Sequence, residues 1–231
     1  MRILMMTGSL PYPPHQGGAI RAYGMLRGLN DAGHKVTLLS FHDENQNALP
    51  QDSPLRSVCE RIVTVPFPRR STVTRLRDLI LSSQADIATR LESAPMHTAL
   101  RDLFSSARFD LAQFEGIEIA NYLFAVQELQ PGITTIYDAF NAEAALQQVI
   151  AQVDRQDLRR LPNAVYSQIQ SGRIERFERA ICQVASAVVA VSDEDAAILR
   201  TYRADHTVHV VPSGIFTSDY SQPSEPLDLE G

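Results

Sequence analysis

The sequence predicts an α/β fold, namely one doubly wound, Rossmann-like domain with a parallel sheet of about seven strands and helices on both faces. Short apolar runs alternate with segments of helical periodicity along the chain. Because strands that alternate with helices form right-handed crossover units, the strands should run parallel. A chain of 231 residues, 44% of them hydrophobic, is long enough to bury a substantial core.

The first strand is expected at Arg2–Thr7, an apolar run typical of a buried strand. A helix should follow at Ala19–Ala32, where apolar residues recur near helical spacing, and Gly33 is a typical helix stop. Further apolar runs predict the second strand at His34–Phe41 and the third at Arg61–Phe67.

The middle of the chain continues the alternation. Helical periodicity predicts helices at Val73–Ser82 and Pro95–Ser105. A fourth strand is then expected at Phe109–Phe114, a helix at Glu118–Leu129, and a fifth strand at Ile133–Tyr137.

The last third of the chain completes the domain. A long helical stretch is expected at Ala142–Val184, broken at Pro162 because proline interrupts helical hydrogen bonding. A sixth strand should follow at Ala185–Val191, then a helix at Asp193–Tyr202 and a seventh strand at Val208–Val211.

Composition bounds the organisation and the function. Residues 1–217 should form the domain, and residues 218–231, rich in Ser, Pro and acidic side chains, a linker.

The net charge of −6 and the pI of 5.5 argue against a nucleic-acid binder. Cys59 and Cys182 lack metal-ligand spacing and are expected to be reduced thiols of a cytoplasmic protein. No secretory signal is visible, and no apolar run reaches the ~20 residues of a spanning helix.

Ligands of an open parallel sheet bind beyond the carboxyl ends of its strands. After the first strand comes a long, proline-rich loop that ends in Gly17 and Gly18 at the start of a helix. Glycine lets a ligand approach the backbone, and free N–H groups at a helix N-terminus attract phosphate oxygens, although the two glycines could also merely turn the chain. The loop matches neither G-x-G-x-x-G nor G-x-x-x-x-G-K-[ST], which disfavours an NAD-dependent oxidoreductase and a P-loop enzyme.

Polar residues also follow the later strands. Glu115 follows the fourth strand and Asp138 the fifth. Carboxylates beside a buried sheet need a partner or a ligand, so a structural salt bridge and a functional role are both open for each. Asn141 and Ser192 stand where they could cap the helices that follow them, and capping is the simpler interpretation of Ser192.

Other chemistry has little support. The sequence contains no G-x-S-x-G elbow, no H-E-x-x-H and no cysteine pair. His206 and His209 flank a short strand but are poor candidates for a metal site, so no metal is expected; His15 in the glycine loop is the histidine of most interest.

An arginine-rich segment precedes the apolar run Leu79-Ile80-Leu81. Its cations are Arg69, Arg70, Arg75 and Arg77. One interpretation is the solvated start of an amphipathic helix. The other is a binding surface, either for lipid headgroups on the inner face of a membrane, as a peripheral contact, or for a phosphorylated acceptor.

Five motifs occur in an order and spacing that are specific when taken together. They are PYPPHQGG, LRGLNDAGHKV, YDAFNAE, ERFE followed by AVVAVSDE, and VVPSGI. With them the chain resembles, over nearly all its length, the N-terminal domain of family 4 glycosyltransferases, which are retaining enzymes built from two Rossmann-like domains (the GT-B architecture).

The resemblance implies a protein that transfers a sugar from a nucleotide-sugar donor to a glycan or lipid-linked acceptor, without a cofactor. The residues it implies at the donor phosphates are Gly17, Gly18, Ser213 and Gly214. The residues it implies in the acceptor cleft are His15, Glu115, Phe140, Asn141 and Ser192. Asp138 and Glu143 are the implied catalytic residues.

The chain also departs from the family pattern. Phe140 stands where many members have histidine, and phenylalanine cannot exchange protons or hydrogen-bond a sugar hydroxyl. Ser213 and Phe216 replace the usual Asn and Asp. The family's donor-binding C-terminal domain is expected to act in cis or in trans, and the isolated half to be inactive. The alternative function is a non-catalytic α/β binding or partner module.

Overall fold

The computed structural model describes residues 1–43, 49–69, 82–154 and 161–217. The described residues form a seven-stranded sheet in the order β3-β2-β1-β4-β5-β6-β7, and each strand is parallel to its neighbours. The strands are β1 Arg2–Thr7, β2 Lys35–His42, β3 Arg61–Pro66, β4 Leu111–Glu115, β5 Thr134–Ala139, β6 Ala187–Ala190 and β7 His209–Val210. The predicted fold class is therefore confirmed.

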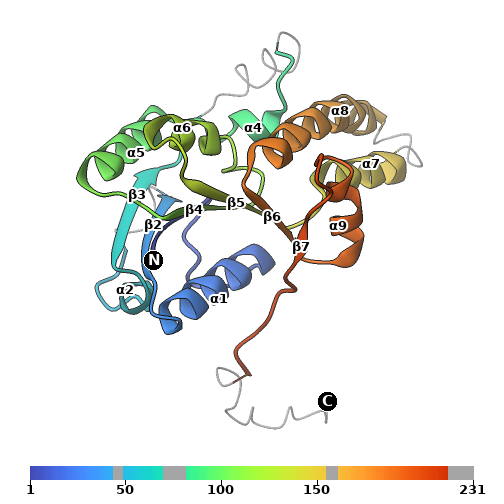
Figure 1. Cartoon of the computed structure of the whole chain (residues 1–231). Coiled ribbons are helices and arrows are strands. Elements are labelled where there is room, and N and C mark those ends of the chain that lie inside the picture. The colour runs from blue at the N-terminus through green and yellow to red at the C-terminus, as the bar shows by residue number, and fades with distance from the viewer. Residues whose placement is uncertain (44–48, 70–81, 155–160, 218–231) are drawn as a thin grey trace, which may run out of the picture.

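Helices cover both faces of the sheet, with α1 and α2 on one side and α5, α6 and α8 on the other (Figure 1). The described helices are α1 Gly17–Asp31, α2 Leu55–Val58, α4 Asp86–Thr89, α5 Ala94–Ser106, α6 Tyr122–Leu129, α7 Glu143–Asp154, α8 Leu161–Val184 and α9 Asp193–Arg200. The order of strands reverses direction between β1 and β4, which is where ligands bind in doubly wound sheets.

The core has two layers because side chains of a strand alternate between faces. Ile3 and Met5 of β1 pack with Leu26 of α1 in the smaller cluster. Leu4 and Met6 point the other way, into a larger cluster that includes buried residues of α5, α6 and α8. Both faces of β1 are buried, which explains its continuous apolar run.

Most element boundaries lie within a few residues of those expected, and two differences have clear causes. α6 begins at Tyr122 rather than Glu118, because Gly116 adopts a left-handed φ of 85° and the following residues form turns. α8 begins at Leu161, so Pro162 occupies the first turn, where its missing N–H costs no helical hydrogen bond. α2 and α4, each of four residues, were not expected.

Several sequence-based expectations lie outside the described residues. They are almost all of the helix expected at 73–82, the proposed linker at 218–231, and Arg70, Arg75 and Arg77 of the arginine-rich segment. Among the residues that are described, no helix is long and apolar enough to cross a bilayer.

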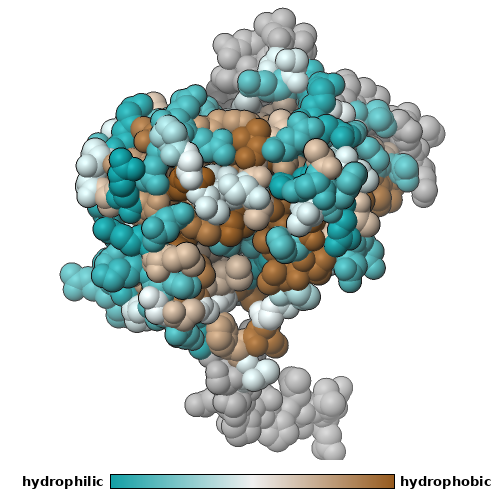
Figure 2. All heavy atoms as spheres, in the orientation of Figure 1, coloured by the Kyte–Doolittle hydropathy of each residue, from teal (hydrophilic) through white to brown (hydrophobic). Residues whose placement is uncertain are grey.

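Beyond β7 the chain returns toward α1. The guanidinium carbon of Arg27 lies 3.5 Å from the ring centroid of Phe216. Figure 2 shows brown, apolar residues over β7 and the chain that follows it, where Val211 and Ile215 are 38% and 62% exposed. The segment after β7 is thus attached to α1 while apolar side chains remain at the surface.

Candidate functional site

Residues at or next to the ends of three neighbouring strands form a polar row at the carboxyl edge of the sheet. Thr7 of β1 pairs in register with Glu115 of β4, and Glu115 with Asp138 of β5. All three are buried, at 3%, 3% and 0% exposure. The parallel register therefore places two carboxyl groups side by side, as the polar ends of the predicted strands suggested.

Arg21 of α1 is the partner of Asp138. Its Nη2 donates to Asp138 Oδ1 at 2.8 Å and its Nε to Oδ2 at 3.0 Å. Its Nη1 donates to the Val211 carbonyl at 2.7 Å and is 3.4 Å from Ser213 Oγ. One buried guanidinium thus joins α1, the end of β5 and the segment after β7.

The carboxyl groups of Glu115 and Asp138 both lie near the Arg21 guanidinium, whose positive charge favours their ionised forms. Burial, and next the Asp138 carboxylate, raise the pKa of Glu115 well above its usual range, against the hydrogen bond from Gln113 and the charge of Arg21. Burial also raises the pKa of Asp138, opposed by Arg21. Because the guanidinium contacts Asp138 directly, Glu115 is the carboxyl that retains a proton to higher pH.

A pocket of about 390 Å³ opens above this row. Its lining comes from the ends of β1, β4 and β5, the loop after β1 and the first turns of α1. Of the predicted site residues, it contains Gly18, Glu115, Phe140, Asn141 and Glu143.

Phe140 packs against the two glycines that flank the pocket. A Cβ added to Gly18 would lie 2.9 Å from Phe140 Cε2, and one added to Gly116 would lie 3.2 Å from the same atom. A Cβ on Gly17 would meet no described atom within 4 Å. The glycine at 18 is therefore required by an aromatic ring, and the backbone of Gly17 is the open one.

The first turn of α1 keeps its N–H groups available. Gln16 precedes the helix in an extended conformation, and within the described structure its side chain makes no capping hydrogen bond. Gly17, Gly18 and Ala19 therefore present helix N-terminal amides beside the pocket, which is favourable for an anion such as a diphosphate.

The helix that carries Glu143 is held from an unexpected direction. Glu178 of α8 accepts hydrogen bonds from the Glu143 and Ala144 amides at 2.9 and 3.3 Å, and the Ala142 amide donates to Asp195. Burial raises the pKa of Glu178 to about 7. The carboxylates of Glu178 and Asp195 therefore cap the start of α7, the role that the sequence suggested for Asn141. Asn141 is exposed and lines the pocket instead.

The sequence analysis gave neither Arg21 nor Glu178 a role in the site, although Glu178 ends the ERFE motif and each position left a signal. Arg21 precedes Ala22 on the buried face of α1, and Glu178 follows Ile174 by one turn on the buried face of α8. A charged residue on an otherwise apolar stripe predicts a buried partner. The sequence could not identify the partner, because it lies on a distant element.

The other predicted site residues lie around the pocket rather than in its lining. Ser192 accepts the Asp195 amide at 3.1 Å and caps α9, as the simpler interpretation predicted. Ser213 contacts Arg21, and Gly214 and His15 are exposed. Asp138 lies beneath the pocket and does not line it.

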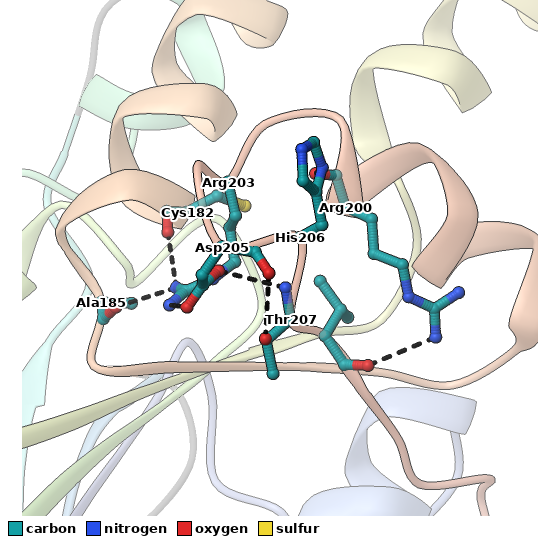
Figure 3. A network of polar contacts seen from close by, with 8 residues as sticks. Cys182, Ala185, Arg200, Arg203, Asp205, His206 and Thr207 are labelled. Atoms are coloured by element: carbon teal, nitrogen blue, oxygen red, sulfur yellow. Dashed lines mark hydrogen bonds and ion pairs between the residues drawn. The ribbon is translucent and has the colours of Figure 1, made fainter.

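A separate polar cluster is drawn in Figure 3. Its residues lie at the end of α8, before β6, and between the end of α9 and β7, which places it at the opposite, amino-terminal edge of the sheet. Arg203 donates to the carbonyl oxygens of Cys182 and Ala185 at 2.7 and 2.9 Å and also binds Asp205. His206 Nδ1 lies 3.0 Å from the Arg200 carbonyl oxygen. The cluster closes the end of α8, and across the described ranges no three potential metal-ligating side chains come together.

Residues 16–214 match the family model described as the glycosyl transferase 4-like domain. No curated protein matches the sequence. Among solved structures, the chain is similar to sucrose-phosphate synthase from Thermosynechococcus elongatus, with 14% identity and a TM-score of 0.56 over 92% of this chain and 47% of that one. It is also similar to an indoxyl-glucosylating UDP-glucosyltransferase from Polygonum tinctorium, with 12% identity and a TM-score of 0.52 over 92% and 52% of the two chains.

These similarities extend over nearly all of this chain, which spans about half the length of the solved structures it matches. At such low identity they show a shared fold, one half of the two-domain GT-B architecture.

Proposed function

Since the chain belongs to the glycosyl transferase 4-like domain family, we propose that it is the acceptor-side half of a retaining glycosyltransferase. It would act with a donor-binding domain, in cis or in trans, on a nucleotide-sugar and a glycan or lipid-linked acceptor. The observation that carries the proposal is the pocket itself, which lies at the reversal of strand order beside a glycine-led helix N-terminus, within the family match.

The proposal gives the predicted donor residues different tasks. The N–H groups at Gly17 and Gly18 would stabilise the departing diphosphate, with Gly17 the more accessible of the two. Ser213 and Gly214 follow β7 and are held beside α1 through Arg21, so they would complete the donor side of the cleft.

The two carboxylates implied in catalysis also differ in position. Glu143 lines the pocket and is partly exposed, so it is the carboxylate that can contact an acceptor. Asp138 has both oxygens bound by Arg21, so we propose that it acts through Arg21 by positioning α1. The acceptor would contact Glu115, Asn141 and Phe140, which share the pocket with Glu143.

The non-catalytic binding module is the second candidate function, and one observation favours it. Phe140 packs against Gly18 and Gly116 at the position where a proton-exchanging histidine stands in many relatives, so the pocket presents an inert ring there. Such a pocket could bind a glycan without transferring a sugar.

Sugar transfer distinguishes the two candidates. The chain is combined with a donor-binding domain and incubated with UDP-, GDP- and ADP-sugars and a panel of acceptors. Acceptor-dependent release of the nucleoside diphosphate is expected from a transferase. Saturable acceptor binding without release for every donor would support the binding module and overturn the enzyme.

A further inference from the structure

Two polar atoms at the floor of the pocket lack a hydrogen-bond partner. Thr7 Oγ1 and Glu115 Oε2 are buried, and neither is bonded to any group that the structure describes. The two residues are register neighbours on β1 and β4, are each 3% exposed, and both line the pocket. Buried polar atoms are nearly always hydrogen-bonded, so the missing partner is expected from the pocket side.

One of the two oxygens of the Glu115 carboxyl group already has a hydrogen-bond partner. Its Oε1 accepts a hydrogen bond from Gln113 at 2.6 Å. Because Glu115 retains a proton and Oε1 accepts from Gln113, Oε2 carries the hydrogen and is the free donor at this position. The Thr7 hydroxyl beside it can both donate and accept.

The charge of the lining indicates what can enter. Its ionisable side chains are Glu115, Glu118, Glu143 and Tyr137, and it contains no Arg, Lys or His among the residues described. The two guanidinium groups nearby are engaged, that of Arg21 with Asp138 and that of Arg90 with Glu118. A phosphate or carboxylate at the floor of the pocket, beside Thr7 and Glu115, would therefore meet carboxyl groups and no free cation. The amides at the start of α1 are assigned to the donor diphosphate under the proposed function.

On the basis of the proposed transferase function, we propose that the pocket accepts an uncharged, hydroxyl-bearing acceptor and excludes phosphorylated and carboxylated ones. One acceptor hydroxyl accepts from Glu115 Oε2 and donates to Thr7 Oγ1. The chemistry of the floor thus selects the part of the acceptor that enters, while any anionic group stays outside the pocket.

An amino sugar is the other ligand that an acidic pocket could take. Burial and the Asp138 carboxylate raise the pKa of Glu115, which keeps this carboxyl from the full charge that would balance an ammonium group. A hydroxyl makes the same contacts without burying a charge, so the neutral ligand is favoured.

The test measures binding to the full chain by saturation-transfer difference NMR. The probes are the methyl glycosides of glucose, galactose and mannose, the 6-phosphates of the same hexoses, and the corresponding 2-amino sugars. At least one neutral glycoside should bind saturably, and its phosphate and amino counterparts should bind at least about tenfold more weakly.

Two variants test the contacts directly. Thr7→Val removes the hydroxyl while keeping the side-chain shape, and Glu115→Met removes the Oε2 donor while keeping a side chain of similar length. Each should weaken binding of the neutral glycoside about tenfold. Thr37→Val is the matched control, because Thr37 is a buried threonine of β2 outside the pocket lining. Thermal unfolding confirms that each variant folds.

The proposal is overturned if a phosphate or amino sugar binds as tightly as its neutral counterpart, if both variants bind like the wild type, or if no neutral glycoside binds. The assay contains no nucleotide-sugar, so its outcome is separate from that of the transfer assay. Binding of a neutral glycoside without sugar transfer would contradict only the proposed transferase function. Sugar transfer to a phosphorylated acceptor would contradict only the proposed selectivity for neutral acceptors.

Discussion

The guanidinium of Arg21 and the carboxylate of Asp138 form a bidentate ion pair between side chains that are 3% and 0% exposed. The pair links the first helix to the fifth strand, and the same guanidinium binds the carbonyl of Val211. Because the first turns of α1 and the residues just after β5 line the pocket, this pair controls the geometry of the site as well as its charge.

Removing the cation should be severely destabilising. Arg21→Met leaves the Asp138 carboxylate buried without its partner, which is expected to lower the free energy of unfolding by about 3–5 kcal/mol. The double variant Arg21→Met/Asp138→Leu, which removes both charges, should recover much of that loss. Urea unfolding of the two single variants and the double variant measures the coupling. Strictly additive losses would show that the pair has no energetic significance.

The two adjacent glycines should respond differently to alanine. At Gly18 a Cβ would lie 2.9 Å from the Phe140 ring, so Gly18→Ala is expected to cost about 1–3 kcal/mol of stability. At Gly17 the same substitution meets no described atom and should be close to neutral. Thermal unfolding gives both values. Phe140→Leu combined with Gly18→Ala should relieve the clash, and an equal loss at both glycines would contradict the packing.

Glu178 should make stability depend on pH. Burial raises its pKa from 4.5 to about 7, so the folded chain binds a proton that the unfolded chain releases. Stability from this group is fully present below pH 4.5 and is lost as the pH rises through 7. The loss is of the order of 3 kcal/mol.

The measurement is urea unfolding between pH 4.5 and 8. Glu178→Gln should make the pH profile shallower because its amide does not titrate, and the slope that remains is expected from Glu115 and Asp138, whose pKa values burial also raises. Glu175→Gln, at a half-buried position on the same helix, should keep the wild-type slope. A wild-type slope in Glu178→Gln would mean that another group titrates.

The polar cluster at the amino-terminal edge supports α8 rather than the site. Arg203→Ala removes the donor to the Cys182 and Ala185 carbonyl oxygens and should cost about 1–3 kcal/mol of stability. Binding of the neutral glycoside should be unchanged in the folded variant, because these residues lie at the edge opposite the pocket. Chemical denaturation with a parallel NMR titration checks both. Lost binding at full stability would connect the cluster to the pocket.

The fold class and the strand positions could be predicted from the sequence because both faces of β1 and β2 are buried, which produces continuous apolar runs. Polar residues after each run then predict a shared edge, since parallel strands end on the same side. This reasoning located Glu115 and Asp138 without any tertiary information, and Glu143 was implied by the family resemblance.

The pairings within that edge could not be predicted. Arg21 and Asp138 are 117 positions apart, and Glu178 and Glu143 are 35 apart, so only the assembled fold shows that they meet. The contact of Phe140 with Gly18 depends on the direction of one side chain at a tight turn. A charged residue on a buried helix stripe indicates that a partner exists but does not identify it.

The central claim is that the pocket beside Gly17 is where sugar transfer takes place. Gly17→Val places a side chain in the open space before α1, and Gly28→Val is its control, at an exposed glycine of the same helix with no described neighbour within 4 Å. Combined with a donor-binding domain, Gly17→Val should release nucleoside diphosphate about 100-fold more slowly than the Gly28→Val control, with both chains folded. Equal rates for the two variants would contradict the account, because the diphosphate would then not lie at the start of α1.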